Sequence, residues 1–214
     1  MIEVGIIDMS IGSLNSLETS LSNLGIESAY CNKPEELNSY KFIIIPGIGN
    51  FGSSSKSLMS KDWGKAIKNF LVHPENKLLG ICLGFQILFE SSDESPESRG
   101  LRLVKGNIEK LQKSQSIRVP HVGWNSVFPE KKNLFLNFMD SDLDVYFVHS
   151  YALILKDKKI TEQFDEYTIT NHGKNLFISS FRLKNLYGCQ FHPEKSSKVG
   201  IKFLKSFLNI NAQD

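Results

Sequence analysis

The stretch GICLG at residues 80–84 is the feature that most constrains how this chain can fold. It follows the apolar pair Leu78 and Leu79 and precedes FQILF, so the pattern predicts a buried strand, a tight turn and a helix. Glycines at both ends of the turn let the strand and the helix approach closely around a strained central residue. Such a turn presents the side chain of Cys82 at the carboxyl edge of a sheet, where the N–H groups of a helix N-terminus favour a thiolate. Cys82 is therefore a candidate nucleophile, the alternative being a buried cysteine in an ordinary turn.

The segments around this turn alternate between strand patterns and helix patterns. Strands are expected at 2–7, 26–30 and 42–45, and helices at 14–24, 57–71 and 199–208. Alternation of this kind predicts an α/β fold, with a mostly parallel sheet covered by helices on both faces. Strand-rich stretches in the middle of the chain predict antiparallel strands and hairpins at one side of that core, at 101–111, 117–128, 145–155 and 167–181. The length suits a single domain over residues 1–214.

A second motif, GCQFHPEKS at residues 188–196, ends another apolar strand. A cysteine nucleophile needs a base to remove its proton, and the base needs a group that orients it. His192 and Glu194 supply these two side chains, and catalytic groups of a parallel sheet gather beyond the carboxyl ends of its strands. Taken singly, each has an ordinary explanation as a turn histidine or a solvated carboxylate. Together with Cys82 they predict a catalytic triad.

Composition agrees with a soluble cytoplasmic enzyme and argues against several other classes. The chain is 41% hydrophobic and 22% charged, which is typical of neither disordered nor membrane proteins. A net charge of +2, from 25 basic and 23 acidic residues, argues against a nucleic-acid-binding surface. The three cysteines show no paired spacing, so neither a disulfide framework nor a metal site is expected, and no cofactor is expected either. No signal peptide and no run long enough to span a bilayer are evident.

The two motifs, GICLGFQILFE and GCQFHPEKS, resemble the signatures of class I glutamine amidotransferases, whose triad is Cys-His-Glu. Three other blocks are similar to one branch of that family, the glutaminase subunits of imidazole glycerol phosphate synthases; they are PGIGNF at 46–51, VPHVGWN at 119–125 and YFVHSY at 146–151. The resemblance runs from Ile6 to Phe207. It implies a flavodoxin-like core with an added antiparallel sheet. It also implies hydrolysis of L-glutamine to glutamate and ammonia through a thioester on Cys82.

The resemblance further implies a partner, because ammonia released in water is protonated and lost. The chain shows neither a phosphate-binding glycine loop nor a second catalytic constellation, so the synthase is expected to be another polypeptide. The implied partner is a synthase (cyclase) subunit with a (β/α)8 barrel, forming a heterodimer and adding the ammonia to a phosphorylated ribulose intermediate. The residues proposed for the partner interface are His121, Trp124, Asn125 and Lys195.

Other site residues follow from the chemistry and from the resemblance. An oxyanion hole should use the backbone N–H of Leu83, the residue after the nucleophile, and a donor from the glycine-rich loop formed by Gly47, Ile48 and Gly49. By resemblance, substrate binding falls to the following residues: Gln86, Glu94, His149, Ser150 and Tyr151. For Gln86 the alternative is an exposed helix residue, and for Glu94 a solvated loop charge.

Some positions depart from the pattern of the branch. Met9 and Ser13 stand in the first turn where other residues are usual, Ala152 replaces an expected Tyr, and His172 precedes a glycine where Tyr is usual. Because of these departures, an alternative is that the chain is a paralogue that feeds ammonia to a different barrel-type synthase, for example in surface-sugar biosynthesis. A catalytically silent binding subunit and a free-standing thiol hydrolase of γ-glutamyl compounds are further alternatives. The intact triad argues against the first of these two, and the VPHVGWN and YFVHSY blocks argue against the second.

Overall fold

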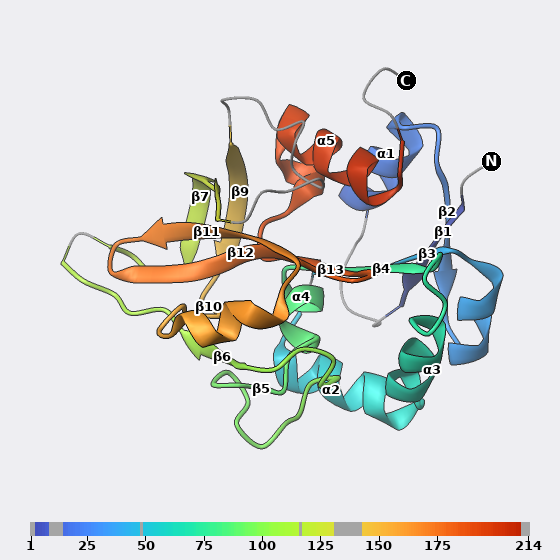
Figure 1. Cartoon of the computed structure of the whole chain (residues 1–214), viewed down its shortest axis with the longest axis horizontal. Coiled ribbons are helices and arrows are strands. Elements are labelled where there is room, and N and C mark those ends of the chain that lie inside the picture. The colour runs from blue at the N-terminus through green and yellow to red at the C-terminus, as the bar shows by residue number, and fades with distance from the viewer. Residues whose placement is uncertain (1–2, 9–14, 48, 116, 131–142, 211–214) are drawn as a thin grey trace.

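The computed structural model describes residues 3–8, 15–47, 49–115, 117–130 and 143–210, and its main feature is an eight-stranded sheet (Figure 1). Five neighbouring strands are parallel: β2 (Glu27–Cys31), β1 (Glu3–Ile7), β3 (Phe42–Ile45), β4 (Lys77–Ile81) and β13 (Leu186–Cys189). Three antiparallel strands continue the same sheet: β12 (Asn175–Leu183), β11 (Glu166–His172) and β8 (Phe128–Pro129). The expected α/β class with an antiparallel addition is confirmed.

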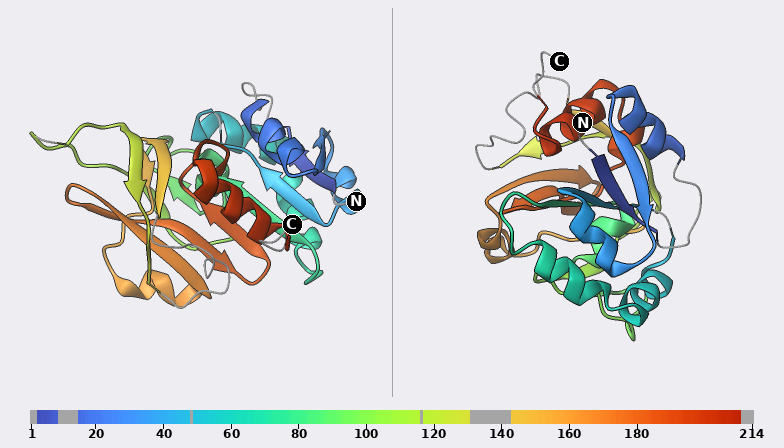
Figure 2. Two further views of the ribbon diagram at one scale, coloured as in Figure 1. Left: turned by 90° about the horizontal axis from the view of Figure 1, so that it is seen from above. Right: turned by 90° about the vertical axis from the view of Figure 1, so that its right-hand side faces the viewer.

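Helices cover both faces of the parallel strands. Figure 2 shows α1 (Asn15–Asn23) and α5 (Ser197–Phe207) side by side over one face. Apolar side chains of these two helices pack with those of β1, β3 and β4 that point the same way. The opposite face is covered by α2 (Phe51–Ser60), α3 (Trp63–Phe70) and the short α4 (Leu83–Ile87). Because strand side chains alternate between the two faces, a strand buried on both is apolar throughout, as FIII of β3 illustrates.

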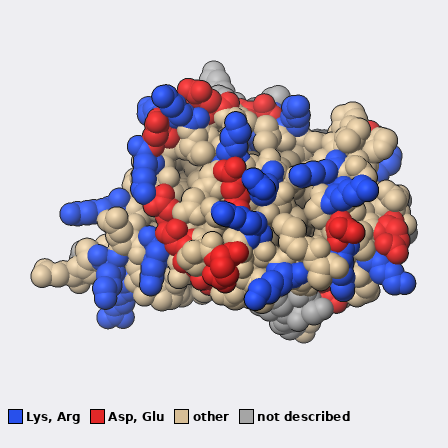
Figure 3. Space-filling model, turned by 90° about the horizontal axis from the view of Figure 1, so that it is seen from below, with Lys and Arg blue, Asp and Glu red and all other residues tan. Residues whose placement is uncertain are grey.

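The remaining strands form two small sheets beside this core. One is β5 (Ser91–Ser92), β6 (Asn107–Lys110) and β10 (Tyr151–Ala152); the other is an antiparallel ladder of β7 (His121–Ser126) and β9 (Asp144–His149). Short 3-10 turns lie at η1 (Pro34–Ser39), η2 (Lys158–Gln163) and η3 (Pro193–Lys195). In the face shown in Figure 3, basic and acidic side chains are interspersed. Among the described residues, no helix has both the length and the apolar character needed to cross a bilayer.

The helix expected at 57–71 is the clearest correction to the sequence-based elements. The structure has two helices there, because Asn50 caps α2 by accepting from the N–H groups of Gly52 and Ser53, so the helix starts earlier. Asp62 then adopts a left-handed backbone with φ 57°, which ends one helix and begins the next. A second correction concerns 101–111, where only β6 is a strand. Residues 101–104 instead form a loop whose N–H groups donate to the carbonyls of Ile87, Leu88 and Phe89.

Candidate active site

Cys82 lies directly between β4 and α4 in a strained backbone conformation. Its φ of 49° and ψ of −100° are rare for a residue with a side chain. Hydrogen bonds on both sides hold it there: its N–H donates to the carbonyl of Cys189 at 2.8 Å, and its own carbonyl accepts from the N–H of Gln86 at 3.0 Å. The sequence pattern therefore does build the sharp strand-to-helix turn that was expected of it.

Glycines make this turn possible by leaving out side chains where backbones meet. A Cβ on Gly84 would lie 2.0 Å from the carbonyl oxygen of Ile45, and one on Gly80 would lie 2.5 Å from the carbonyl oxygen of Gly84. A Cβ on Gly47 would lie 2.7 Å from the Cβ of Cys82, which places the glycine-rich loop beside the candidate nucleophile. The close approach of β3, β4 and α4 thus depends on these positions.

We expect Gly84→Ala to lower the free energy of unfolding by about 3 kcal/mol, because its methyl group would overlap backbone atoms that cannot move independently. Gly64→Ala in α3 is the matched control. Its Cβ would meet only Leu101 Cδ2, at 3.7 Å, so it should stabilise the chain by about 0.5–1 kcal/mol through helix propensity. Urea titration of both variants measures the difference. Equal stability of the two would contradict the close approach at the turn.

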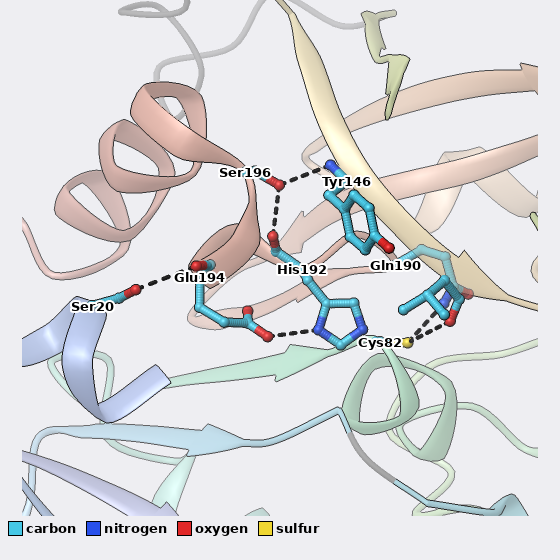
Figure 4. Close-up of polar contacts among 8 residues, drawn as sticks. Ser20, Cys82, Tyr146, Gln190, His192, Glu194 and Ser196 are labelled. Carbon is cyan, nitrogen blue, oxygen red and sulfur yellow. Dashed lines mark hydrogen bonds and ion pairs between the residues drawn. The ribbon is translucent and has the colours of Figure 1, made fainter. Parts of the chain in front are cut away.

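His192 and Glu194 meet in a buried ion pair just after β13. Nδ1 of His192 lies 2.6 Å from Oε1 of Glu194, and the exposed fractions of the two side chains are 5% and 10%. The backbone is fixed as well: the N–H of His192 donates to the carbonyl of Tyr146 at 2.9 Å, and the hydroxyl of Ser196 donates to the carbonyl of His192 at 2.6 Å. Figure 4 shows the imidazole between Glu194 and Cys82, so the ring edge that carries Nε2 is turned toward the sulfur.

The electrostatics of His192 favour its charged form. Burial lowers the pKa of His192, but the negative charge of Cys82 as a thiolate and the carboxylate of Glu194 outweigh burial and raise the pKa to about 10. Nε2 is buried and has no hydrogen-bond partner among the described residues, which leaves it available to a reacting atom. The arrangement can therefore hold an imidazolium beside a thiolate and exchange one proton between them and a substrate.

Two of the candidate oxyanion-hole residues, Leu83 and Gly47, lie next to Cys82, one in the sequence and one in space. Leu83 begins α4, where the first backbone N–H groups of a helix have no partner within the helix. Gly47 packs against Cys82, and Gly49 has φ 118°, a conformation that favours glycine. Ile48 lies outside the described residues.

The substrate-binding candidates are placed less uniformly. The side chain of Gln86 is buried rather than exposed, and its Nε2 donates to the carbonyl of Tyr151 at 2.8 Å and to Oε1 of Gln190 at 3.2 Å. The carboxylate of Glu94 accepts from the N–H of Phe51 at 2.8 Å, so it holds the start of α2 just beyond the glycine-rich loop. The carbonyl of Ser150 accepts from Leu111. Their roles toward a substrate stay predictions.

Gln190 is a site residue that sequence reasoning missed. Its Nε2 lies 3.7 Å from the sulfur of Cys82, and the side chain is fully buried. The available signal was its place in GCQFHPEKS, two residues before His192 at the end of a strand.

His121 and His149 are both buried and bond to each other. Nε2 of His149 lies 3.1 Å from Nδ1 of His121, and Nδ1 of His149 donates to the carbonyl of Tyr151 at 2.9 Å. His121 stacks on Phe147 and on His172, with ring centroids 4.7 Å and 3.9 Å apart. Burial, followed by the neighbouring histidines, lowers the pKa of His121 to about 4 and that of His149 to about 3.

These lowered pKa values predict acid sensitivity. The pKa values of both histidines in the folded chain lie below the usual 6.5, so as pH falls the unfolded chain binds protons before the folded chain does. The contribution of the neutral histidines to the free energy of unfolding is therefore complete above about pH 6.5 and is lost as pH falls toward 4. We expect a loss of about 3 kcal/mol in the free energy of unfolding across this window. Denaturant titrations at pH 7 and pH 4.5 measure it. His121→Gln should flatten the pH dependence, whereas the exposed His73→Gln should not; equal slopes in both variants would contradict the assignment.

Three of the candidate partner residues, His121, Trp124 and Asn125, divide between the two faces of the β7–β9 ladder. Val122 pairs with Val148 and Trp124 pairs with Tyr146, and on this face Val122, Trp124 and Val148 are 56%, 55% and 38% exposed. We call these four residues the apolar patch. Exposed apolar groups gathered in this way mark interaction surfaces.

The prediction that His121 lies at a surface is wrong, because its side chain is buried on the opposite face of the ladder. Asn125 lies on that face too, and its Nδ2 donates to the carbonyl of Asn171 at 2.8 Å. Lys195 is exposed in η3, beside the triad. Ala152 is buried, so it does not face a partner either, while Met9 and Ser13 lie outside the described residues.

Comparison with known proteins agrees with this geometry. The family model for glutamine amidotransferase class-I matches residues 5–210. A protein of Caldanaerobacter subterraneus subsp. tengcongensis, named imidazole glycerol phosphate synthase subunit HisH, is 38% identical over 207 residues, which cover 95% of this chain and 96% of the relative. A protein of the same name from Pyrococcus furiosus is 36% identical over 213 residues, covering 98% of this chain and all of the relative.

Solved structures show the same fold at lower identity. The chain matches PurLQS from Thermotoga maritima with a TM-score of 0.67 and 18% identity, covering 97% of this chain and 98% of that one. It matches a crystal structure titled glutamine amidotransferase with a TM-score of 0.65 and 17% identity, covering 96% and 97%. The chain therefore belongs to the class I glutamine amidotransferase family, within the branch of the imidazole glycerol phosphate synthase subunits HisH.

Proposed function

We propose that the protein is the glutaminase subunit of an imidazole glycerol phosphate synthase, and that it hydrolyses L-glutamine to glutamate and ammonia for histidine biosynthesis. The observation that carries the proposal is the buried pair of His192 and Glu194 facing Cys82 at the strand ends, in a chain of this family. We also infer a cytoplasmic location, in keeping with three buried cysteines that are free thiols.

In the proposed reaction, the Cys82 thiolate attacks the γ-carbonyl carbon of glutamine. The imidazolium of His192 gives its proton to the departing nitrogen, and ammonia leaves a glutamyl thioester on the sulfur. His192 then takes a proton from water, the resulting hydroxide attacks the thioester, and glutamate leaves while the thiolate and imidazolium return. Glu194 keeps the proton on Nδ1, so that Nε2 faces the reacting atoms.

Negative charge on the carbonyl oxygen needs donors during both attacks. We assign the N–H of Leu83 and a donor from the loop of Gly47, Ile48 and Gly49 to this role, since Gly47 packs beside Cys82. Loss of one such donor typically costs about 10²–10³ in rate. The carboxylate of Glu94 accepts from the N–H of Phe51 just beyond this loop. We assign the same carboxylate to the α-ammonium group of the substrate.

For the partner, we propose a synthase (cyclase) subunit with a (β/α)8 barrel that covers the apolar patch. The strand that carries Tyr146 and Val148 also reaches the site: the carbonyl of Val148 lies 3.9 Å from the sulfur of Cys82, and the carbonyl of Tyr146 accepts from His192. A protein docked on the patch would therefore cover the place where ammonia forms and receive it away from water.

Rescue of a histidine auxotroph that lacks this subunit tests the pathway. The chain, expressed with the synthase subunit of its own organism, should restore growth without histidine, and a Cys82→Ala chain should not. If growth is not restored while glutamine is still hydrolysed in the presence of that synthase, the paralogue that serves another barrel-type synthase is the correct assignment. If the unsubstituted chain does not hydrolyse glutamine in the presence of that synthase, the proposal is removed altogether.

A further inference from the structure

We propose that Gln190 is a positioning residue for the nucleophile: its side-chain amide donates a hydrogen bond to the sulfur of Cys82 and holds the thiolate in place between itself and His192. The inference rests on the proposed function, because it concerns the same thiol. Gln190 follows β13, and its side chain is fully buried with Nε2 at 3.7 Å from the sulfur (Figure 4). The amide of Gln190 can donate to the sulfur of Cys82 only if its nitrogen, and not its oxygen, faces the sulfur.

The neighbours of Gln190 decide that orientation. A backbone carbonyl can only accept, so Gln86 must present its NH₂ group to the carbonyl of Tyr151, 2.8 Å away. The same nitrogen has a second hydrogen, which points at the side chain of Gln190 at 3.2 Å. That atom of Gln190 must therefore be its oxygen. The NH₂ group of Gln190 is left facing Cys82.

The carbonyl of Tyr151 is itself held by a chain of donors. Nδ1 of His149 donates to it, so Nε2 of a neutral His149 is an acceptor and takes the proton of His121 Nδ1. Nε2 of His121 is then an acceptor for the amide of Asn125, at 3.2 Å. Each contact pairs one donor with one acceptor only if both rings are neutral, which agrees with their lowered pKa values. The orientation of Gln190 is thus fixed by the fold well beyond the site.

The chemical consequence is a difference between the two states of the sulfur. A thiolate is a strong acceptor, and a neutral amide donor beside it favours the charged form without competing for the proton of His192. The neutral thiol instead has an acceptor within reach, since the carbonyl of Val148 lies 3.9 Å away. Deprotonation therefore changes the preferred hydrogen-bond partner of the sulfur from the carbonyl of Val148 to the amide of Gln190.

Alkylation of the isolated chain by iodoacetamide tests the inference without glutamine or a partner. The thiolate displaces iodide, so the rate at each pH reports the reactive thiolate of Cys82, read by mass spectrometry of its peptide. Gln190→Glu keeps the size and the acceptor for Gln86 but puts negative charge at the sulfur; Gln190→Met keeps the size and removes the donor. We expect the rate at pH 7 to fall about tenfold in Gln190→Met and further in Gln190→Glu, with the profile moved upward by about one pH unit or more.

Gln163→Glu is the matched control, because the side chain of this glutamine in η2 bonds to backbone groups of Lys105 and Ile160 rather than to Cys82. It should alkylate as the unsubstituted chain does. Misfolding is detected in the same experiment: Cys31 and Cys189 have no exposed surface, in contrast to Cys82 at 6%, and burial raises the pKa of both thiols, so both should stay unmodified. If Gln190→Glu fails that check, Gln190→Met decides.

Alkylation of Cys82 in folded Gln190→Met at the rate and pH profile of the unsubstituted chain would overturn the inference. The proposed function fails differently: it is lost if the unsubstituted chain, with its synthase, does not hydrolyse glutamine, whatever the alkylation rates. With hydrolysis present, Gln190→Met should lower kcat about tenfold and leave KM unchanged, whereas a role in binding the substrate would raise KM instead.

Discussion

Cys82→Ala should abolish glutamine-dependent turnover, with a loss of at least about 10⁴-fold, while synthesis from added ammonium salt by the partner subunit continues. The reason is that the thioester cannot form without the sulfur, whereas the fold keeps its strand-to-helix turn with the smaller side chain. Glutamate release and product formation from ammonium, measured on the same complex, separate the two activities. Loss of both would instead indicate that the complex no longer forms.

Cys31→Ala is the matched control for the nucleophile. Cys31 is also a buried thiol, but it lies in β2 at the edge of the sheet, where burial, with Glu36 and Glu3, raises its pKa to about 11. The substitution should leave turnover unchanged. A glutamine analogue with a reactive ketone or diazo group should accordingly modify Cys82 and spare the other two cysteines. Modification mainly at Cys31 or Cys189 would contradict the assignment.

Local sequence patterns were sufficient to place the triad candidates. Cys82, His192 and Glu194 each lie in a short motif at the end of an apolar strand, and parallel strands bring such ends to one edge of a sheet. The order and the class of the fold followed from the same alternation of apolar runs. To predict these features it was enough to know whether each segment is a strand or a helix and where it ends.

Other features depended on contacts that no local pattern encodes. Gln86 is predicted to bind the substrate, and no local pattern indicates that its amide bonds to Gln190, which is 104 residues away in the sequence. His121 and Trp124 are three residues apart, so alternation assigns them to opposite faces of a strand, yet it does not say which face is buried. Packing on Phe147 decides that question, and only the folded ladder brings that ring under His121.

The apolar patch gives the second large prediction, because it joins docking to catalysis. Trp124→Glu should weaken binding of the synthase subunit about 10- to 100-fold, since it removes a large exposed aromatic group and places a charge in the contact. Its effect on the stability of the single chain should be small, because the side chain is more than half exposed. Titration calorimetry with the synthase of the same organism measures the affinity.

Val72→Glu is the matched control, since Val72 is also an exposed apolar residue but follows α3, near the start of β4 and away from Cys82. It should bind the synthase normally. Because Trp124 lies on the exposed face of the ladder, the Trp124→Glu chain should still react with iodoacetamide at Cys82 at the usual rate. Glutamine-dependent synthesis by the complex should recover at high synthase concentration. Unchanged affinity in Trp124→Glu, or an equal loss in Val72→Glu, would mean that the partner docks elsewhere. The ammonia formed at Cys82 would then need another route to its acceptor. The expected route passes β9, because this strand carries Tyr146 and Val148 of the apolar patch and its carbonyls also contact Cys82 and His192.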